Sequence, residues 1–386
     1  MRVIHVITRL IVGGAQENTI ASVFGLHAKP GFEVTLVAGP TFGREGSLES
    51  AFTRHPELLT IVPQLVRPLH PWKDFLAWKK LTQLFRACRP EIVHTHSGKA
   101  GVLGRLAAAR AGVPLILHTI HGPSFGPFQG SLANVFFCAA ERRAARVTTH
   151  FVVVADAMKQ QYLAAGIGRS DRYTRIFSGF ALEPFVTAKN DLQLRARFGF
   201  LPEDIIIGKI ARLFELKGHG DLLAIAPSLV RRCPRIKFLL VGDGSWRARL
   251  ENQVRSLGLE RQVVFAGLVA PDAIPSLLGI MDILVHLSLR EGLPRALPQA
   301  LAAARPIVAF DVDGAQEVCL ENETGFLVRP GDLPGLGERL LRLAQDALLR
   351  QRLGRRGQEL VRTHFDINHM VDELHQLYVR LKGAGV

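Results

Sequence analysis

The stretch Ile205-Ile206-Ile207-Gly208-Lys209-Ile210-Ala211-Arg212-Leu213-Phe214-Glu215-Leu216-Lys217-Gly218 shows how this chain folds. Residues 205–210 are mostly β-branched and apolar, which is typical of a buried strand. A basic loop follows, and residues 219–232 then have the apolar spacing of a helix. A strand, a loop and a helix in this order form the repeating unit of a parallel sheet that is covered by helices.

The same unit recurs along the whole chain. In the first half we expect strands at Val3–Ile7, Glu33–Ala38, Ile92–His96, Leu115–Thr119, Thr149–Val154 and Tyr173–Phe177, and helices at Ala15–Lys29, Lys73–Cys88, Ala100–Ala111 and Leu132–Arg146. In the second half we expect strands at Ile205–Ile210, Ile236–Val241, Val263–Ala266, Ile283–His286, Ile307–Phe310 and Gly325–Val328, and helices at about 219–232, 244–257, 271–279 and 294–304. The pattern predicts an α/β protein with two doubly wound domains in tandem.

The domains are expected to meet in an irregular linker, Ser178–Asn190, and the chain is expected to be helical beyond Asp332. The last helical stretch, Ile367–Leu381, is amphipathic. A length of 386 residues suits two domains of roughly 150–200 residues each. The 48% of hydrophobic residues argues against a disordered chain.

No apolar run reaches the roughly 18–20 residues that a membrane helix needs. The first apolar run, Met1–Ile7, is too short for a signal peptide, so we expect a cytoplasmic protein. The four cysteines, Cys88, Cys138, Cys233 and Cys319, lie far apart and fit small buried side chains better than a metal site.

Positive charge is concentrated in the first half of the chain. The formal net charge is +14, and residues 1–180 hold 21 Lys and Arg against 10 Asp and Glu, a net of +11. Such a surface fits an anionic membrane, a phosphorylated substrate or solvent alone. Because no recognised nucleic-acid module accompanies the charge, nucleic acid is not an expected partner. The arginines Arg142, Arg143 and Arg146 lie near Phe125, Phe128, Phe136 and Phe137, which form either a membrane-docking surface or a buried aromatic core.

The most specific motif follows the strand Ile205–Ile210. Arg212 lies just past its end, and Lys217 stands five residues later, before a helix. Ligands of open α/β folds bind outside the carboxyl ends of the strands, so two cations there are suited to a diphosphate. The glycine pair Gly13-Gly14 follows the first strand and allows a close backbone approach or simply a tight turn, and Gly242 raises the same two alternatives.

Glu291 lies on the loop that follows the strand Ile283–His286. The N–H groups of Gly292 and Leu293 could hold phosphate while the carboxylate accepts sugar hydroxyls, although a carboxylate there also suits a helix N-terminus. Gln299 is expected two turns into the next helix, where its amide could bind a ribose. Asp313 either shapes the sugar pocket or forms a turn.

Histidines gather at the strand ends of the first domain. His121 lies at the end of the strand around Leu115–Thr119, just before Gly122. By alternation it points to the sheet face opposite to that of His118. His94 and His96 share one strand face, and His96 and Lys99 open a helix that could contribute to acceptor binding. Because no acidic residue or cysteine accompanies them in a ligand pattern, no metal is expected.

Together these residues resemble the retaining glycosyltransferases of family 4, which have the GT-B fold. The resemblance spans nearly the whole chain and rests on Gly13-Gly14, His94-Thr95-His96-Ser97, His121-Gly122, Arg212 with Lys217-Gly218, Glu291-Gly292 and Asp311-Val312-Asp313-Gly314. It implies an acceptor-binding domain at 1–180, a nucleotide-sugar domain at 191–364 and a helix at 365–386 that returns to the first domain.

The resemblance also implies residue roles. Arg212 and Lys217 would hold the diphosphate of a donor such as a UDP-sugar, Glu291 would grip the transferred sugar, and His121 would lie beside the reacting sugar. No cofactor or metal is implied. The acceptor would be a glycan or a lipid-linked glycan of the cell envelope, reached by peripheral docking on the cytoplasmic membrane.

One position departs from the family pattern of two glutamates separated by seven residues. Gln299 stands where the second glutamate is expected, at the contact with the nucleoside ribose. The departure puts donor affinity in doubt more than the chemistry, since an amide bonds a hydroxyl without the help of a charge. Two other functions stay open at this point, a nucleotide-sugar epimerase of the same fold and a non-catalytic subunit that binds nucleotide sugars.

Overall fold

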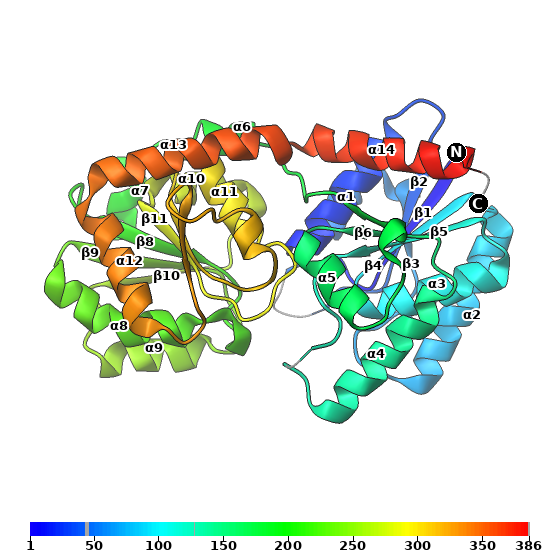
Figure 1. The fold of residues 1–386 in the computed structure, drawn as a ribbon, viewed down its shortest axis with the longest axis horizontal. Helices are drawn as coiled ribbons and strands as arrows, with labels where there is room; N and C mark the ends of the chain where they lie inside the picture. Colours follow the sequence, from blue (N-terminus) through cyan, green and yellow to red (C-terminus); the bar gives the residue numbers. More distant parts are fainter. Residues whose placement is uncertain (43–45, 127, 385–386) are drawn as a thin grey trace. The chain divides into compact units, whose positions relative to one another are not determined.

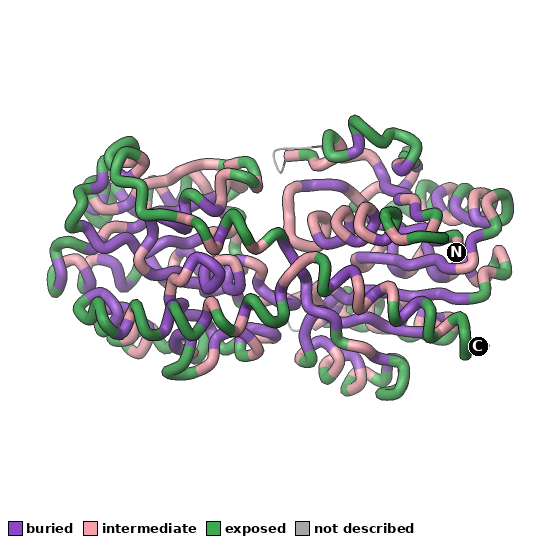
Figure 2. Tube along the Cα trace, turned by 90° about the horizontal axis from the view of Figure 1, so that it is seen from above, coloured by how far each residue is buried: buried purple, intermediate pink, exposed green. Residues whose placement is uncertain are grey.

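The computed structural model describes residues 1–42, 46–126 and 128–384. The chain divides into two compact units (Figure 1), Met1–Phe180 with Ile367–Val386, and Ala181–Asp366. Positions 385 and 386 of the expected C-terminal segment lie outside the described residues. In each unit the central strands of the sheet are buried, whereas the outward faces of the helices are exposed (Figure 2).

The first unit is built on a seven-stranded parallel sheet in the order β3-β2-β1-β4-β5-β6-β7. Its strands are β1 (Arg2–Ile7), β2 (Glu33–Ala38), β3 (Leu59–Ile61), β4 (Ile92–His96), β5 (Leu115–Ile120), β6 (His150–Val153) and β7 (Tyr173–Arg175). Its helices are α1 (Gly14–His27), α2 (Pro71–Cys88), α3 (Gly98–Ala111), α4 (Ser131–Ala145), α5 (Asp156–Ala164) and α14 (Ile367–Gly383).

Alternation along the strands divides the apolar side chains of this sheet between two cores. On one face, Val3 of β1 and Leu117 of β5 pack in the same core as residues of α1 and α14. On the other face, Ile4 and Ile116 pack with residues of α2 and α3. Odd-numbered residues of β1 and β5 therefore face α14, although this helix lies at the opposite end of the sequence.

The second unit repeats the plan with a six-stranded parallel sheet in the order β10-β9-β8-β11-β12-β13. Its strands are β8 (Ile205–Ile210), β9 (Ile236–Val241), β10 (Val263–Gly267), β11 (Ile283–His286), β12 (Ile307–Phe310) and β13 (Gly325–Val328). Its helices are α6 (Glu183–Val186), α7 (Leu192–Arg197), α8 (His219–Arg232), α9 (Arg247–Ser256), α10 (Ile274–Ile280), α11 (Ala296–Ala302), α12 (Leu333–Gln345) and α13 (Ala347–His364). The two sheets confirm the expected α/β architecture.

Some local expectations are wrong. The edge strand β3 was not expected, and the linker region contains the short helix α6. The helix expected from residue 294 begins at Ala296, so Gln299 lies in its first turn rather than two turns in. Gly292 and Leu293 consequently lie in a turn before the helix.

The cysteines fit the expectation of buried side chains only in part. Cys233 and Cys319 are buried, whereas Cys88 and Cys138 are partly exposed, and all four are free thiols. Within the described ranges, none of the helices combines the length and the apolar character that crossing a bilayer requires.

Candidate functional site

In each sheet the order in which successive strands are added reverses once. The candidate residues gather at this switch point in each unit. The strand order runs outward in opposite directions from the β1–β4 pair in the first unit and from the β8–β11 pair in the second. In doubly wound folds, ligands bind at such switch points, beyond the carboxyl ends of the strands. Each unit therefore presents one candidate site.

In the second unit, a glycine brings the loop after β8 against the loop after β11. Gly218 has φ +64°, and a Cβ there would lie 2.1 Å from the carbonyl oxygen of Leu287. Only glycine tolerates both this backbone conformation and this approach. The close contact places Lys217, at the end of a 3-10 turn (Glu215–Lys217), beside the loop that carries Glu291.

Lys217 and Glu291 form the central contact of this site. The Lys217 ammonium donates a hydrogen bond to Glu291 Oε1, and His286 Nε2 lies 3.3 Å from the same oxygen. Burial alone would raise the pKa of Glu291, but Lys217 and His286 outweigh it and hold this pKa well below its ordinary value. Glu291 is therefore a fixed carboxylate at neutral pH.

Asp313 positions the backbone of the same loop. Its Oδ2 accepts a hydrogen bond of 2.7 Å from the N–H of Glu291, and its own φ is +52°. The next N–H groups, of Gly292 and Leu293, donate to no acceptor among the described residues. Asp313 thus holds the glutamate loop, while two backbone donors remain available for a ligand.

A buried lysine that the sequence analysis did not single out lies beneath the pair. Lys209 of β8 is fully buried, and its ammonium has no hydrogen-bond partner among the described residues. Burial, together with the positive charge of Lys217, lowers its pKa from 10.5 to about 7. A charged residue inside an otherwise apolar strand was the signal in the sequence that could have identified it.

The other residues expected at the donor site are Arg212, Gln299 and Gly242. Arg212 is exposed, and its guanidinium lies 5.0 Å from the centre of the Phe214 ring. Gln299 is partly exposed on α11. Gly242 has φ +130°, and a Cβ there would lie 2.2 Å from the carbonyl oxygen of Ala211, so the close approach of two loops already explains this glycine.

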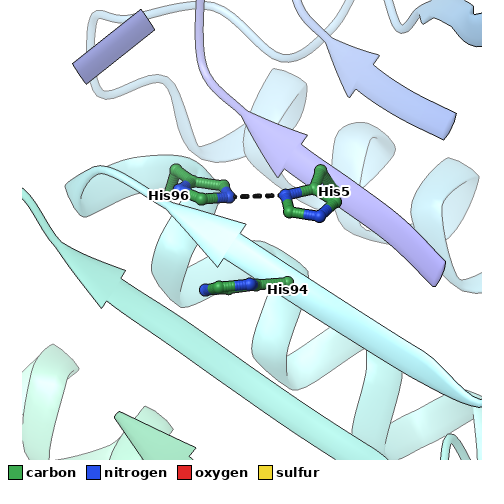
Figure 3. A group of neighbouring side chains, drawn as sticks. All are labelled: His5, His94 and His96. Carbon is green, nitrogen blue, oxygen red and sulfur yellow. Dashed lines mark hydrogen bonds between the residues drawn. The ribbon is translucent and has the colours of Figure 1, made fainter. Parts of the chain in front are cut away.

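In the first unit, histidines of β1 and β4 meet at the switch point (Figure 3). His5 of β1 donates to or accepts from His96 of β4 at 2.8 Å, and the ring of His94 stacks on that of His96 at 4.6 Å. His121, just beyond β5, lies 3.0 Å from His96 through Nε2 and Nδ1. The expected shared face of His94 and His96 is confirmed. His118 instead lies on the other side, against Thr95 and Gly101.

The histidine cluster, formed by His5, His94, His96 and His121, is neutral. Desolvation lowers the pKa of His5 and of His121 to about 3, and it lowers the pKa of His94 and His96 well below the ordinary value. The ligand nitrogens of His5, His94 and His96 lie within 4.8 Å of one another, which is the spacing of a possible metal site. In the present arrangement, hydrogen bonds already occupy both nitrogens of each of the three rings.

Lys99 and the pair Gly13-Gly14 were also expected to contact ligands in this unit. The ammonium of Lys99 pairs with the carboxylate of Asp74 and donates to the carbonyl oxygen of Pro68. Gly13 caps the N-terminus of α1 with φ 173°, an extended conformation that does not require glycine, and Gly14 is the first residue of that helix. The geometry therefore brings His96 and His121 together and leaves Lys99 in an ion pair with α2.

Comparison with known proteins places both units in one family. The model for "Glycosyltransferase Family 4" matches residues 12–183, and the model for "Glycosyl transferases group 1" matches residues 191–360. A UDP-Gal:alpha-D-GlcNAc-diphosphoundecaprenol alpha-1,3-galactosyltransferase of Escherichia coli is 26% identical over 98% of this chain and 97% of that protein. The capsular polysaccharide biosynthesis glycosyltransferase CapM of Staphylococcus aureus is 24% identical over 83% of this chain and 85% of its own length.

Solved structures agree on the fold. HepE of Anabaena, determined in complex with UDP-glucose, superposes with a TM-score of 0.82 over 98% of this chain and all of that chain, at 22% identity. A sucrose-phosphate synthase from Thermosynechococcus elongatus superposes with a TM-score of 0.83 over the full length of both chains, at 20% identity. Family models across both sheets, together with these relatives, show that the chain belongs to the family 4 glycosyltransferases, and that it is a hexosyltransferase-type enzyme with the GT-B fold.

Proposed function

We propose that this enzyme transfers a hexosyl group from a UDP-sugar to a hydroxyl group of a lipid-linked glycan, with retention of the anomeric configuration. The names of the relatives support the donor and the acceptor class, since the Escherichia coli protein uses UDP-Gal and a diphosphoundecaprenol-linked sugar. The observation that carries the proposal is the contact between Lys217 and Glu291 at the switch point of the second sheet.

In the proposed reaction, the bond between the anomeric carbon and the diphosphate oxygen breaks, and the acceptor oxygen bonds to the same face of that carbon. The proton of the acceptor hydroxyl passes to the departing phosphate. Arg212 and Lys217 stabilise the negative charge that develops on the diphosphate, together with the N–H groups of Gly292 and Leu293. Because these groups supply the positive charge, the proposed reaction needs no metal ion and no cofactor.

Glu291 has two partners in turn under this proposal. Without donor, its carboxylate holds the Lys217 ammonium. With donor bound, Lys217 turns to the diphosphate and Glu291 accepts hydroxyl groups of the transferred sugar. His121 of the first unit contacts that sugar as a neutral ring, Gln299 and Gly242 bind the nucleoside, and Asp313 acts through the position of Glu291.

An exposed apolar face on α4 supports docking on a membrane. Leu132, Val135 and Phe136 share one side of this helix and are 90%, 67% and 57% exposed. Arg142 and Arg143 are exposed at the other end of the same helix. Phe125, in contrast, is buried against Tyr162, so the aromatic residues near α4 belong partly to the core and partly to the surface.

A second exposed apolar group lies at the start of α2, where Trp72 and Phe75 are 65% and 50% exposed. Both helices pack against α3. Apolar side chains beside cationic ones are typical of surfaces that lie on anionic lipid. We therefore propose that α2 and α4 dock on the inner face of the cytoplasmic membrane, where a lipid-linked acceptor would be found.

The transferase proposal is tested by incubating the protein with UDP-galactose or UDP-glucose and GlcNAc-diphosphoundecaprenol, with and without EDTA. We expect a disaccharide-lipid with an α-linkage, formed equally well in EDTA. Isomerisation of the donor sugar without acceptor would instead show an epimerase. Donor binding in a thermal-shift assay, without turnover on any lipid-linked acceptor, would show a binding subunit.

The membrane proposal is tested by co-sedimentation with vesicles of phosphatidylglycerol or phosphatidylcholine at low and moderate salt. We expect binding to the anionic vesicles that weakens with salt and is lost in a Leu132→Ser/Phe136→Ser variant. Equal binding to both lipids, or no binding, would contradict docking on anionic lipid.

A further inference from the structure

Four histidines of the first unit, His5, His94, His96 and His121, are links in one continuous chain of hydrogen bonds. Thr119 Oγ1 lies 2.7 Å from His94 Nε2, and His94 Nδ1 bonds to the hydroxyl oxygen of Tyr378. That oxygen lies 3.3 Å from His5 Nε2. The chain continues from His5 to His96 and from His96 to His121.

Tyr378 is the link that the sequence gives no reason to expect. It lies on α14, which packs on the sheet face to which the odd-numbered residues of β1 and β5 point. Its side chain is fully buried, and its hydroxyl links His94 to His5, whose rings lie 5.0 Å apart but share no direct hydrogen bond among the described residues. Without this hydroxyl the series of hydrogen bonds would be interrupted between His94 and His5.

The protons in this chain are coupled. A neutral imidazole carries one proton, so one of its nitrogens donates and the other accepts. The low pKa values of His5 and His121, both about 3, mean that the rings are neutral at physiological pH. Each hydrogen bond holds a single proton, and the donors must therefore all point the same way along the chain.

Thr119 decides between the two directions. Its side chain is buried, and its hydroxyl makes no hydrogen bond among the described residues other than the one to His94. If His94 donated to Thr119, the threonine proton would be left buried without an acceptor, which is rare in proteins. Thr119 therefore donates to His94, His94 to Tyr378, and so on to His121.

We propose that this chain of hydrogen bonds is a relay that fixes the tautomer of His121, with its proton on Nδ1. His96 Nδ1–H donates to His121 Nε2, so the remaining proton of His121 must be on Nδ1. This nitrogen has no hydrogen-bond partner among the described residues. The relay rests on the proposed function, in which His121 contacts the sugar, and adds that this contact is a hydrogen bond donated by His121.

His5, His94, His96, Thr119 and Tyr378 are positioning residues in this scheme, because they act through His121. A metal ion on His5, His94 and His96 would exclude the relay. The metal ion would bind the ring nitrogens that now form the hydrogen bond between His5 and His96 and the bonds of His94. Its divalent charge would also lack a carboxylate ligand in the cluster. The hydrogen-bonded arrangement satisfies both nitrogens of each of these rings without it.

The test measures the tautomer directly, in full-length protein labelled with 15N-histidine. The His121 signals are assigned by their loss in His121→Gln. In the wild type we expect a protonated Nδ1 and an unprotonated Nε2. In Tyr378→Phe and in Thr119→Val we expect averaged 15N shifts, because each change removes the constraint on the direction of the protons. Thr119→Ser, which keeps the hydroxyl, should retain the wild-type tautomer.

Tyr173→Phe is the matched control. Tyr173 is also buried in the first unit, and its hydroxyl donates to the carbonyl oxygen of Ile167 at 2.8 Å, outside the relay. We expect wild-type shifts for His121 in this variant. With sugar transfer as the readout, Tyr378→Phe should lower kcat about two- to fivefold, in proportion to the loss of the competent tautomer, and leave the donor KM unchanged.

Three results would overturn the relay: a proton on Nε2 of His121 in the wild type, wild-type shifts in both Tyr378→Phe and Thr119→Val, or one equivalent of tightly bound metal in the purified protein. If the protein transferred no sugar at all, the proposed function would fail while the NMR measurement would still decide the relay. If Tyr378→Phe did not fold, Thr119→Val would decide it.

Discussion

The two sheets share the same order over six strands, with β7 added at one edge of the first, yet their switch points differ in charge. In the second unit, Lys217, Glu291 and the buried Lys209 are charged or titrate near neutral pH. In the first unit, His5, His96 and His121 remain neutral and bond to one another. The same position of the fold therefore carries charged side chains in the second unit and neutral side chains in the first.

The difference follows from what each switch point is proposed to bind. A diphosphate carries negative charge that increases as the sugar leaves, so cations fixed in place stabilise the transition state. Sugar hydroxyls are neutral and need donors and acceptors of defined direction. A neutral histidine with a fixed tautomer provides that direction, whereas a protonated one would donate from both nitrogens.

Acid should have the largest effect, because the buried neutral histidines of the first unit favour unfolding when they become protonated. The folded-state pKa of His5 is about 3, against 6.5 in an unfolded chain. The unfolded state therefore binds more protons below about pH 6.5, and stability is lost as the pH falls from about 6.5 toward 3. Between pH 6.5 and 4.5, His5 alone should cost about 2 kcal/mol of unfolding free energy.

This prediction is checked by urea unfolding at several pH values, with proton uptake on unfolding measured at pH 5. His94, His96, His118 and His121 have lowered pKa values as well, so we expect an uptake of several protons. A free energy of unfolding that is constant from pH 7 to pH 4.5 would show that the pKa values of these histidines are the same in the folded and unfolded states.

Removing the cation at the charged switch point should come next in size. Lys217→Ala deletes the partner of Glu291 and the proposed contact with the diphosphate. We expect kcat/KM to fall by about 10²–10³-fold, the usual effect of losing one fixed donor to a developing negative charge. Lys237→Ala removes the same charge from the neighbouring strand β9 and should leave the rate unchanged. Wild-type turnover in Lys217→Ala, with the protein folded, would refute the assignment.

The buried Lys209 should have a smaller effect, on stability. Its pKa is lowered from 10.5 to about 7, so the unfolded state binds more protons between these values and wild-type stability should rise as the pH rises from 7 to 10.5. Lys209→Met should abolish this rise and stabilise the protein at pH 7 by about 1–4 kcal/mol. Thermal unfolding from pH 7 to 10 measures both, with Lys237→Met as the control. A wild-type stability that does not change over this pH range would show that the pKa of Lys209 is not lowered in the folded protein.

The fold was predictable from the sequence because it depends on local patterns. Continuous apolar runs such as Ile307–Phe310 and Gly325–Val328 match their strands residue for residue. The edge strand β3, only three residues long with two exposed, has no such run and was missed. Periodicity is therefore informative where a strand is buried on both faces, and it fails at a sheet edge.

The sites were predictable only where residues follow one another closely along the chain. Lys217 and Glu291 were expected at strand ends, but their contact joins positions 74 residues apart. His94 and Tyr378 are 284 residues apart, and nothing in the local sequence of α14 marks its tyrosine as different from other core residues. Contacts of this kind depend on how helices pack on the sheets, which periodicity does not specify.

The smallest expected effect belongs to Gln299, at the nucleoside end of the charged switch point. Gln299→Glu would restore the second glutamate of the family pattern and allow a charge-assisted hydrogen bond to a ribose hydroxyl. Because this contact is the same in the ground state and the transition state, the donor KM should fall a few fold and kcat should stay constant. Steady-state kinetics with varied donor, with Gln253→Glu on α9 as a control for added charge, would measure this. A large fall in kcat with unchanged KM would place Gln299 beside the reacting carbon rather than the ribose.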